Sequence, residues 1–460
     1  MKSVILNIFS NHKPLDNEIM KVAFATLGCR TNQHDTAEMQ TLMEQEGFAI
    51  VNSREVADVY VINTCSVTQR SDYSSRLAVK NSLTINDKAL VVFTGCYAQL
   101  APDEAAEIEG LDIVLGNADK LDIARVIKKK LAGESRWIKE DKTEIFMSDI
   151  HKKRVFRTIP VSGFQGKTKA FIKVQTGCDE KCAFCTVVRA RGKSISDERQ
   201  NIFDNVTEAI DSGYKEITLT GINLGTYGMD KETPETFSSL VRDIVRLPGD
   251  FRIRLSSINP MEIDDDLLQL IADEEKICPH LHIPLQSGDD AILAKMRRNY
   301  NSGQYLDTVH RALDKIPRLG LGADVIIGFP GETDQGFENT RKLIESLPFT
   351  YLHAFAYSPR KGTEAYGFKN NLPKTVKKER IKILTALAHE KSLQFQRQFI
   401  GKTVTVLLEN HRDSVTGNLR GYSEHYIPVT VPGDDRFKNQ LVSVTIEDVS
   451  EQGVSGCLPS

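Results

Sequence analysis

The sequence predicts an α/β chain in three parts: a doubly wound parallel-sheet domain, a partial (β/α)6 barrel and a small C-terminal β-barrel. Three observations lead to this prediction. Short apolar runs alternate with helical stretches from about residue 21 to 131, which favours a parallel sheet. The alternation resumes at Phe171 with six further strand–helix units. From Gly401 the pattern changes to short alternating runs split by turns, which is typical of a small barrel of strands.

Length and composition agree with this division. The chain has 460 residues, which is enough for about three domains. We expect an N-terminal domain at 20–135, a linker at 136–168, a barrel domain at 169–398 and a last domain at 399–460. No apolar run reaches the ~18 residues of a membrane-spanning helix, so no membrane partner is expected. The eight cysteines are partly clustered and do not suggest a disulfide framework, which favours a reducing, cytoplasmic location.

The N-terminal domain should contain four buried strands. The predicted strands are Val22–Leu27, Val59–Asn63, Leu90–Thr94 and Ile113–Leu115. A helix is predicted at Asp35–Glu46, because Met39, Leu42 and Met43 fall on one face of it and Gly47 follows as a C-cap. Strands separated by helices in this way are expected to be parallel.

A cysteine follows each of the first three predicted strands: Cys29, Cys65 and Cys96. The carboxyl ends of parallel strands meet at one edge of a sheet, so these thiols should meet in space although they are about 30 residues apart. A glycine just before Cys29 and Cys96 lets backbones approach closely. The alternative is three separate buried thiols. We predict that they bind an iron–sulfur cluster with three protein ligands and one open iron.

The barrel domain should contain six strands with helices between them. The predicted strands are Phe171–Gln175, Glu216–Thr220, Arg252–Leu255, Leu281–Leu285, Ala323–Ile327 and His353–Tyr357. Helices are predicted at Asp289–Met296 and Thr333–Ser346, and a long one at Lys374–Arg397 closes the domain. Active residues of such barrels lie at the carboxyl ends of the strands.

The loop after the first barrel strand carries Cys178, Cys182 and Cys185, a C-x3-C-x2-C motif. Structural zinc sites usually have four protein ligands, and no fourth cysteine or histidine lies nearby in the sequence. Three thiolates on a 4Fe–4S cluster leave one iron open, and an open iron can bind a small molecule. The alternatives are a partial zinc site or three unrelated thiols. We predict a 4Fe–4S cluster at the catalytic centre.

The other barrel strands end in small and polar residues that could bind the rest of a cofactor. Each of them could also simply form a turn. The predicted cofactor-binding residues are Thr220, Gly221, Ser256, Gln286, Ser287 and Gly328.

Several longer motifs connect these features. They are Leu27-Gly28-Cys29-Arg30-Thr31-Asn32-Gln33, Asn63-Thr64-Cys65-Ser66-Val67-Thr68, Thr94-Gly95-Cys96-Tyr97-Ala98-Gln99, Leu285-Gln286-Ser287-Gly288 and Tyr357-Ser358-Pro359-Arg360-Lys361-Gly362-Thr363. Together with the C-x3-C-x2-C loop, they resemble the methylthiotransferase family of radical S-adenosylmethionine (SAM) enzymes over nearly the whole chain. The C-terminal module resembles that family's TRAM domain, an OB-like substrate-binding module.

The resemblance implies a reaction and its cofactors. A 4Fe–4S cluster on Cys178, Cys182 and Cys185 would cleave SAM to a 5′-deoxyadenosyl radical, which abstracts hydrogen from an unactivated carbon. A second 4Fe–4S cluster, on the N-terminal cysteines, would hold or supply sulfur, and a second SAM would supply the methyl group. An electron donor such as flavodoxin or ferredoxin is implied, whereas the sequence does not indicate the sulfur source.

The substrate implied by the resemblance is tRNA. Three stretches are most similar to the branch that methylthiolates carbon 2 of N6-threonylcarbamoyladenosine beside the anticodon: Asn32-Gln33, Ser66-Val67-Thr68 and the stretch from Thr220 to Gly228. One departure is that Val188 and Arg189 stand where the tRNA branch usually has a Pro-Tyr pair. The C-terminal module is also more acidic than basic, which would suit a basic ribosomal protein better than RNA.

Alternatives to this substrate remain open at this point. They are an aspartate of a ribosomal protein and isopentenyladenosine in tRNA. A non-enzymatic alternative is an RNA-binding module in which the cysteines hold zinc.

Overall fold

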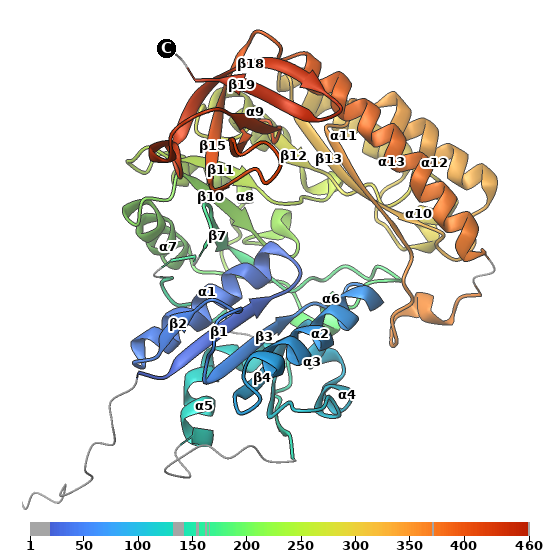
Figure 1. Ribbon diagram of the computed structural model, residues 1–460. Helices are drawn as coiled ribbons and strands as arrows, with labels where there is room; N and C mark the ends of the chain where they lie inside the picture. The colour runs from blue at the N-terminus through green and yellow to red at the C-terminus, as the bar shows by residue number, and fades with distance from the viewer. Residues whose placement is uncertain are drawn as a thin grey trace, which may run out of the picture.

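The computed structural model describes residues 19–131, 142–152, 156–161, 163–164, 166–369 and 372–458. It confirms the α/β class and the three-part architecture (Figure 1). Figure 1 shows the N-terminal sheet and the C-terminal β-barrel at opposite ends of the central partial barrel. None of the described helices has the length and apolarity that crossing a bilayer requires.

The N-terminal region is a six-stranded parallel sheet in the order β2-β1-β3-β4-β5-β6. Its central strands β3 and β4 are buried along their whole length, because helices cover both faces and the strands are almost entirely apolar. Its elements are β1 (Lys21–Thr26), α1 (Arg30–Gln45), β2 (Ala49–Val51), β3 (Val59–Thr64), α2 (Gln69–Ile85), β4 (Leu90–Gly95), α3 (Cys96–Leu100), α4 (Pro102–Ala106), β5 (Ile113–Leu115), η1 (Asn117–Asp122), α5 (Ile123–Leu131) and β6 (Glu144–Phe146).

The four strands predicted here are confirmed, while the edge strands β2 and β6 were not foreseen. Each edge strand has three residues, too few for a recognisable alternation. Strand β6 lies within the stretch expected to be a linker and pairs in parallel with β5. Within that stretch, residues 136–141, 153–155, 162 and 165 lie outside the described residues.

The central region is an open barrel of parallel strands in the order β7-β10-β11-β12-β13-β14, with a bridge between Ile253 and Ile277 joining its two halves. Its elements are β7 (Ala170–Lys173), β8 (Gln175–Thr176), α6 (Val187–Arg191), β9 (Ile195–Ser196), α7 (Arg199–Asp211), β10 (Glu216–Thr220), η2 (Leu224–Thr226), α8 (Phe237–Val245), β11 (Arg252–Leu255), η3 (Pro260–Glu262), α9 (Asp265–Asp273), β12 (His280–His282), α10 (Asp290–Lys295), α11 (Ser302–Lys315), β13 (Gly320–Ile327), α12 (Asp334–Ser346), β14 (Tyr351–Ala356), η4 (Glu364–Gly367) and α13 (Lys374–Arg397).

All six predicted barrel strands are present, although β12 ends earlier than expected. Pro284 has no N–H to give to the ladder, so the bonds to β13 pass from Ile283 directly to Gln286. Side chains alternate across each strand. Leu281 packs in the main core, so His280 and His282 face the barrel interior, as do Arg252 and Arg254 on β11.

The C-terminal region is a closed five-stranded barrel in the order β15-β16-β17-β19-β18. It sits against the amino ends of the central strands, because Arg252 donates to the carbonyl of Thr405 and Arg254 to that of Ser423. The module therefore lies at the end of the central barrel opposite the cysteine loops. Its elements are β15 (Thr403–Arg412), β16 (Leu419–Ser423), β17 (Pro428–Val431), η5 (Asp435–Phe437), β18 (Leu441–Ser450) and β19 (Gly453–Cys457).

Candidate active site between two cysteine clusters

The structure brings Cys29, Cys65 and Cys96 together at the carboxyl edge of the N-terminal sheet. Cys29 caps the start of α1, Cys65 follows β3, and Cys96 begins α3. Gly28 makes the approach possible, since a Cβ at this position would lie 2.6 Å from Cys65 Cβ and 2.8 Å from its Sγ. Burial raises the pKa of the Cys65 thiol to about 11, and the neighbouring sulfurs of Cys96 and Cys29 add to the rise.

The C-x3-C-x2-C loop lies between β8 and α6. Gly177 enters it with a φ of +72°, and a Cβ there would lie 1.9 Å from the Lys193 carbonyl oxygen, so only glycine fits. Each sulfur of this loop accepts an N–H bond, an environment that suits anionic sulfur. The donors are the Glu180 amide to Cys178 at 3.4 Å, Arg298 Nη1 to Cys182 at 3.1 Å and the Val187 amide to Cys185 at 3.4 Å.

The two cysteine clusters face each other across the junction of the N-terminal sheet and the central barrel. The side-chain amide of Asn117 lies 3.9 Å from Cys96 Sγ and donates to the Ala190 carbonyl at 2.7 Å. Ala190 belongs to α6, which follows the Cys185 loop directly. The sulfurs of Cys96 and Cys185 are close enough to interact electrostatically. A molecule bound at this junction could therefore contact both clusters.

The spacing of the sulfurs separates the two metal hypotheses. A tetrahedral zinc ion with sulfurs at about 2.3 Å would hold them within about 4 Å of one another. In the part of the chain that the structure describes, neither cysteine triad has its three sulfurs within 4.8 Å of one another. This spacing does not suit a single zinc ion and leaves room for a larger polynuclear centre.

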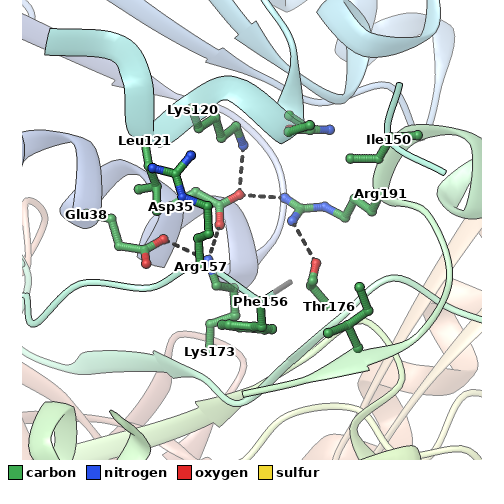
Figure 2. A pocket seen from close by; sticks show the side chains of 13 residues that line it. Asp35, Glu38, Lys120, Leu121, Ile150, Phe156, Arg157, Lys173, Thr176 and Arg191 are labelled. Carbon is green, nitrogen blue, oxygen red and sulfur yellow. Dashed lines mark hydrogen bonds and ion pairs between the residues drawn. The ribbon is translucent and has the colours of Figure 1, made fainter. Parts of the chain in front are cut away.

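A buried network of charges holds the junction together (Figure 2). At its centre is Asp35 of α1, which accepts hydrogen bonds from Lys120 at 2.7 Å, Lys173 at 2.9 Å and Arg191 at 2.8 Å. Burial by itself would raise the pKa of Asp35, but these three cations hold it well below its ordinary value. Glu38, one turn further along α1, accepts from Lys173 at 2.7 Å.

The network also fixes the loops that carry the N-terminal cysteines. Arg191 donates to the side-chain oxygen of Asn32 at 2.5 Å. The amide nitrogen of Asn32 in turn donates to the carbonyls of Leu27 and Thr64, at 2.7 and 2.9 Å. These carbonyls lie on the segments that lead into Cys29 and Cys65. The adjoining cavity of about 100 Å³ is too small for a nucleoside, so we regard the network as structural support.

The predicted cofactor-binding residues lie at the carboxyl ends of the central strands, but their side chains differ in availability. Gln286 has a left-handed backbone, with a φ of +62°, and its buried Oε1 atom has no hydrogen-bond partner in the described structure. A strained residue with an unsatisfied acceptor is typical of a binding site. Ser256, at the end of β11, accepts from Arg30 Nη1 at 3.3 Å.

The other four predicted contacts are less exposed to a ligand. Thr220 is buried at the end of β10, and Gly221 lies against the side chain of Gln175. The Ser287 hydroxyl lies 3.4 Å from that of Thr340 on α12, so its side chain supports the turn. Gly328 has a φ of +73° and lies beneath the side chain of Lys377.

A polar wall inside the central barrel was not foreseen. His282, Asp324 and His353 lie on β12, β13 and β14, and one ligand atom from each lies within 4.8 Å of the others. The Tyr351 hydroxyl lies 3.0 Å from both His280 Nε2 and His282 Nδ1. The His-x-His pattern of β12 could have indicated this polar wall from the sequence, because alternate residues of a strand face the same side.

The departure at Val188 and Arg189 also has a structural consequence. Arg189 Nη1 donates to the Lys361 carbonyl at 2.7 Å. It thereby ties α6 to the loop after β14, which carries the Tyr357–Thr363 motif. The change therefore affects contacts beside the C-x3-C-x2-C loop and leaves its three cysteines in place.

Comparisons with known proteins match two family models to successive parts of the chain. The model of the uncharacterised protein family UPF0004 matches residues 21–116, and that of the radical SAM superfamily matches residues 172–344. The chain is 40% identical to the threonylcarbamoyladenosine tRNA methylthiotransferase MtaB of Aquifex aeolicus, across 88% of this chain and 98% of that protein. It is 35% identical to MtaB of Bacillus subtilis, across 92% of this chain and 93% of that protein.

A more distant relative carries a different substrate in its name. The tRNA-2-methylthio-N(6)-dimethylallyladenosine synthase of Clostridium botulinum is 30% identical, across 98% of this chain and 99% of that protein. Among solved structures, the radical SAM methyltransferase TsrM of Kitasatospora setae, with cobalamin and a 4Fe–4S cluster bound, has a TM-score of 0.51. The match covers 74% of this chain and 75% of that one at 14% identity, so it supports a likeness of fold alone.

Proposed function

The chain belongs to the radical SAM methylthiotransferase family, and from this premise we propose that it methylthiolates carbon 2 of N6-threonylcarbamoyladenosine beside the anticodon of tRNA. The observation that carries the proposal is the pair of cysteine clusters facing each other at one junction. A reaction that needs both radical chemistry and sulfur insertion on the same carbon requires two such centres around one substrate.

We propose that Cys178, Cys182 and Cys185 hold one 4Fe–4S cluster and that Cys29, Cys65 and Cys96 hold the other. When bound, the first cluster would supply the electron that cleaves SAM, and the second would hold the sulfur to be inserted. The chain itself places and shields these groups. Arg298 neutralises charge at Cys182, and the positive charge of Arg191 faces Cys96 and Cys29.

Binding of SAM would use the carboxyl ends of the central strands. The Oε1 of Gln286, which has no hydrogen-bond partner in the described part of the chain, can accept a hydrogen bond from a cofactor hydroxyl or ammonium group. We propose that Ser256 and the backbones around Thr220, Gly221, Ser287 and Gly328 complete this surface. The strained backbone of Gln286 fits a residue that is held ready for a ligand.

The three regions would then have separate tasks. We propose that the N-terminal sheet domain carries the sulfur-supplying centre, that the central barrel cleaves SAM, and that the C-terminal barrel contacts RNA. Because that last module lies at the far end of the central barrel, its contacts would be with a part of the tRNA away from the reacting base. A low-potential electron donor such as flavodoxin or ferredoxin and a reducing cytoplasm suit two open iron–sulfur clusters.

Reconstitution with defined substrates tests the proposal. We expect the anaerobically reconstituted protein to methylthiolate an anticodon stem-loop that contains threonylcarbamoyladenosine. A matched stem-loop with isopentenyladenosine and the purified ribosomal protein should react far more slowly, as judged by mass spectrometry of the products. Faster modification of either alternative would contradict the proposed substrate.

A further inference from the structure

Arg30 is a cation at the mouth of the central barrel, and it has no acidic partner among the residues that the structure describes. It is the first residue of α1, directly after Cys29, and it is half-buried. Its guanidinium donates to the Ser256 hydroxyl at 3.3 Å. Its charge also reaches the interior wall: burial lowers the pKa of His280, and the charges of Arg254 and Arg30 lower it further. The N-terminal domain thus extends one positive group into the barrel.

Several neighbouring guanidinium groups are already paired with carboxylates of the protein. Arg191 pairs with Asp35 at 2.8 Å, and Arg360 pairs with Asp72 at 2.6 Å. Deeper in the barrel, Arg252 and Arg254 share the buried carboxylate of Glu216.

Arg30 differs from these groups, because no carboxylate of the described residues lies within ion-pair distance of it. A partly buried charge without a counter-ion is costly. This cost is offset when a bound ligand supplies the anion that pairs with the guanidinium of Arg30.

We propose that Arg30, held in place by its hydrogen bond to the Ser256 hydroxyl, binds the carboxylate of the substrate's threonylcarbamoyl group. This inference rests on the proposed function and deepens it. The base must lie between the two cysteine clusters for its carbon 2 to receive sulfur, and Arg30 follows Cys29 directly. The threonyl group on the same base ends in a carboxylate, whereas the isopentenyl group is apolar. The interior wall of His280, His282 and Tyr351 is polar as well, which suits a threonyl group.

The methionine part of SAM offers a second source of an amino-acid carboxylate. Its carboxylate and amino groups can chelate the open iron of the cluster proposed on Cys178, Cys182 and Cys185. Arg30 instead adjoins the other cluster, which favours the nucleoside. The two sources can be separated by experiment, because SAM cleavage can be measured without RNA.

The test uses three anticodon stem-loops that differ at one nucleoside. One contains threonylcarbamoyladenosine, one contains its carboxamide analogue, in which the threonyl carboxylate is a neutral amide, and one contains adenosine. Dissociation constants are measured for the reconstituted wild type, Arg30→Gln, Arg30→Lys and the control Arg54→Gln, which changes an exposed arginine in the loop after β2. The rate of 5′-deoxyadenosine formation without RNA reports on SAM.

We expect the wild type and Arg54→Gln to bind the carboxylate stem-loop roughly ten- to a hundredfold more tightly than the carboxamide. Arg30→Gln should bind the two equally, Arg30→Lys should retain part of the preference, and the RNA-free rate should stay unchanged. A preference that survives in Arg30→Gln overturns the proposal, and if SAM cleavage is lost as well, the carboxylate bound by Arg30 is that of SAM. Turnover by the wild type tests the proposed function separately, since the binding comparison does not depend on it.

Discussion

Replacing Cys29 by alanine should stop methylthiolation while the protein still cleaves SAM. The variant lacks one of three sulfurs at the N-terminal sheet edge, and the C-x3-C-x2-C loop keeps all of its donors. Loss of a residue that hydrogen-bonds to a metal ligand already lowers metal affinity or activity about 10- to 100-fold, so loss of a ligand itself should lower the methylthiolated product by more than about 100-fold. Product and 5′-deoxyadenosine are measured in the same reaction.

Cys178→Ala is the matched comparison, and it should stop both products. Cys278→Ala serves as the control, because Cys278 is buried at the opposite end of the central barrel, just before β12, and should leave both unchanged. Full methylthiolation by Cys29→Ala would refute the role of the N-terminal cluster. Unchanged 5′-deoxyadenosine formation by Cys178→Ala would refute that of the barrel loop.

Asp35→Asn should destabilise the protein by about 3–5 kcal/mol, because it leaves buried cations without their anion. Lys120, Lys173 and Arg191 all converge on this carboxylate, and the side chains of all four residues are at most 7% exposed. Lys128→Met is the matched control, since the Lys128–Glu46 pair is about half exposed and should contribute at most about 1 kcal/mol. Chemical denaturation at pH 7 measures both changes.

Acid should reduce the difference between wild type and Asp35→Asn. The folded pKa of Asp35 lies well below its ordinary value of 3.8, so its stabilisation is fully present above that value. It is lost as the pH falls through the folded pKa, because protonation then favours the unfolded chain. The asparagine variant lacks this titration. A difference that stays constant from pH 6 to pH 2, or a change below 1 kcal/mol at pH 7, would contradict the proposed importance of the network.

The sequence predicts the strands and the cysteines well, because both depend on local patterns. β3 and β4 are short, mainly apolar runs that alternate with helices, and the cysteines follow strands whose ends must meet. The polar face of α1 was not predicted as part of the site. Asp35 and Glu38 resemble a solvent-facing stripe of a helix, and their partner Lys173 lies 138 and 135 residues away in the chain. Only the packing of α1 on β7 reveals that this face is buried.

The sequence also does not predict where the C-terminal module packs. Its alternating runs predict a small barrel but do not indicate what it packs against. Arg252 and Arg254 make the hydrogen bonds to the C-terminal module. From the sequence alone, two arginines in a strand would be expected to face solvent. Similarly, the sequence places Arg30 in a cysteine motif but does not predict its contact with Ser256. That contact depends on how the N-terminal sheet packs against the barrel.

If this protein methylthiolates threonylcarbamoyladenosine in tRNA, the modified nucleoside should depend on its gene. The most direct test is mass spectrometry of nucleosides from the total tRNA of cells with and without the gene. Deletion should remove the 2-methylthio form of threonylcarbamoyladenosine, leave the parent nucleoside and 2-methylthio-isopentenyladenosine in place, and be reversed by the wild-type gene but not by its Cys29→Ala form. An unchanged tRNA profile, with loss of methylthio-aspartate from a ribosomal protein, would contradict the account.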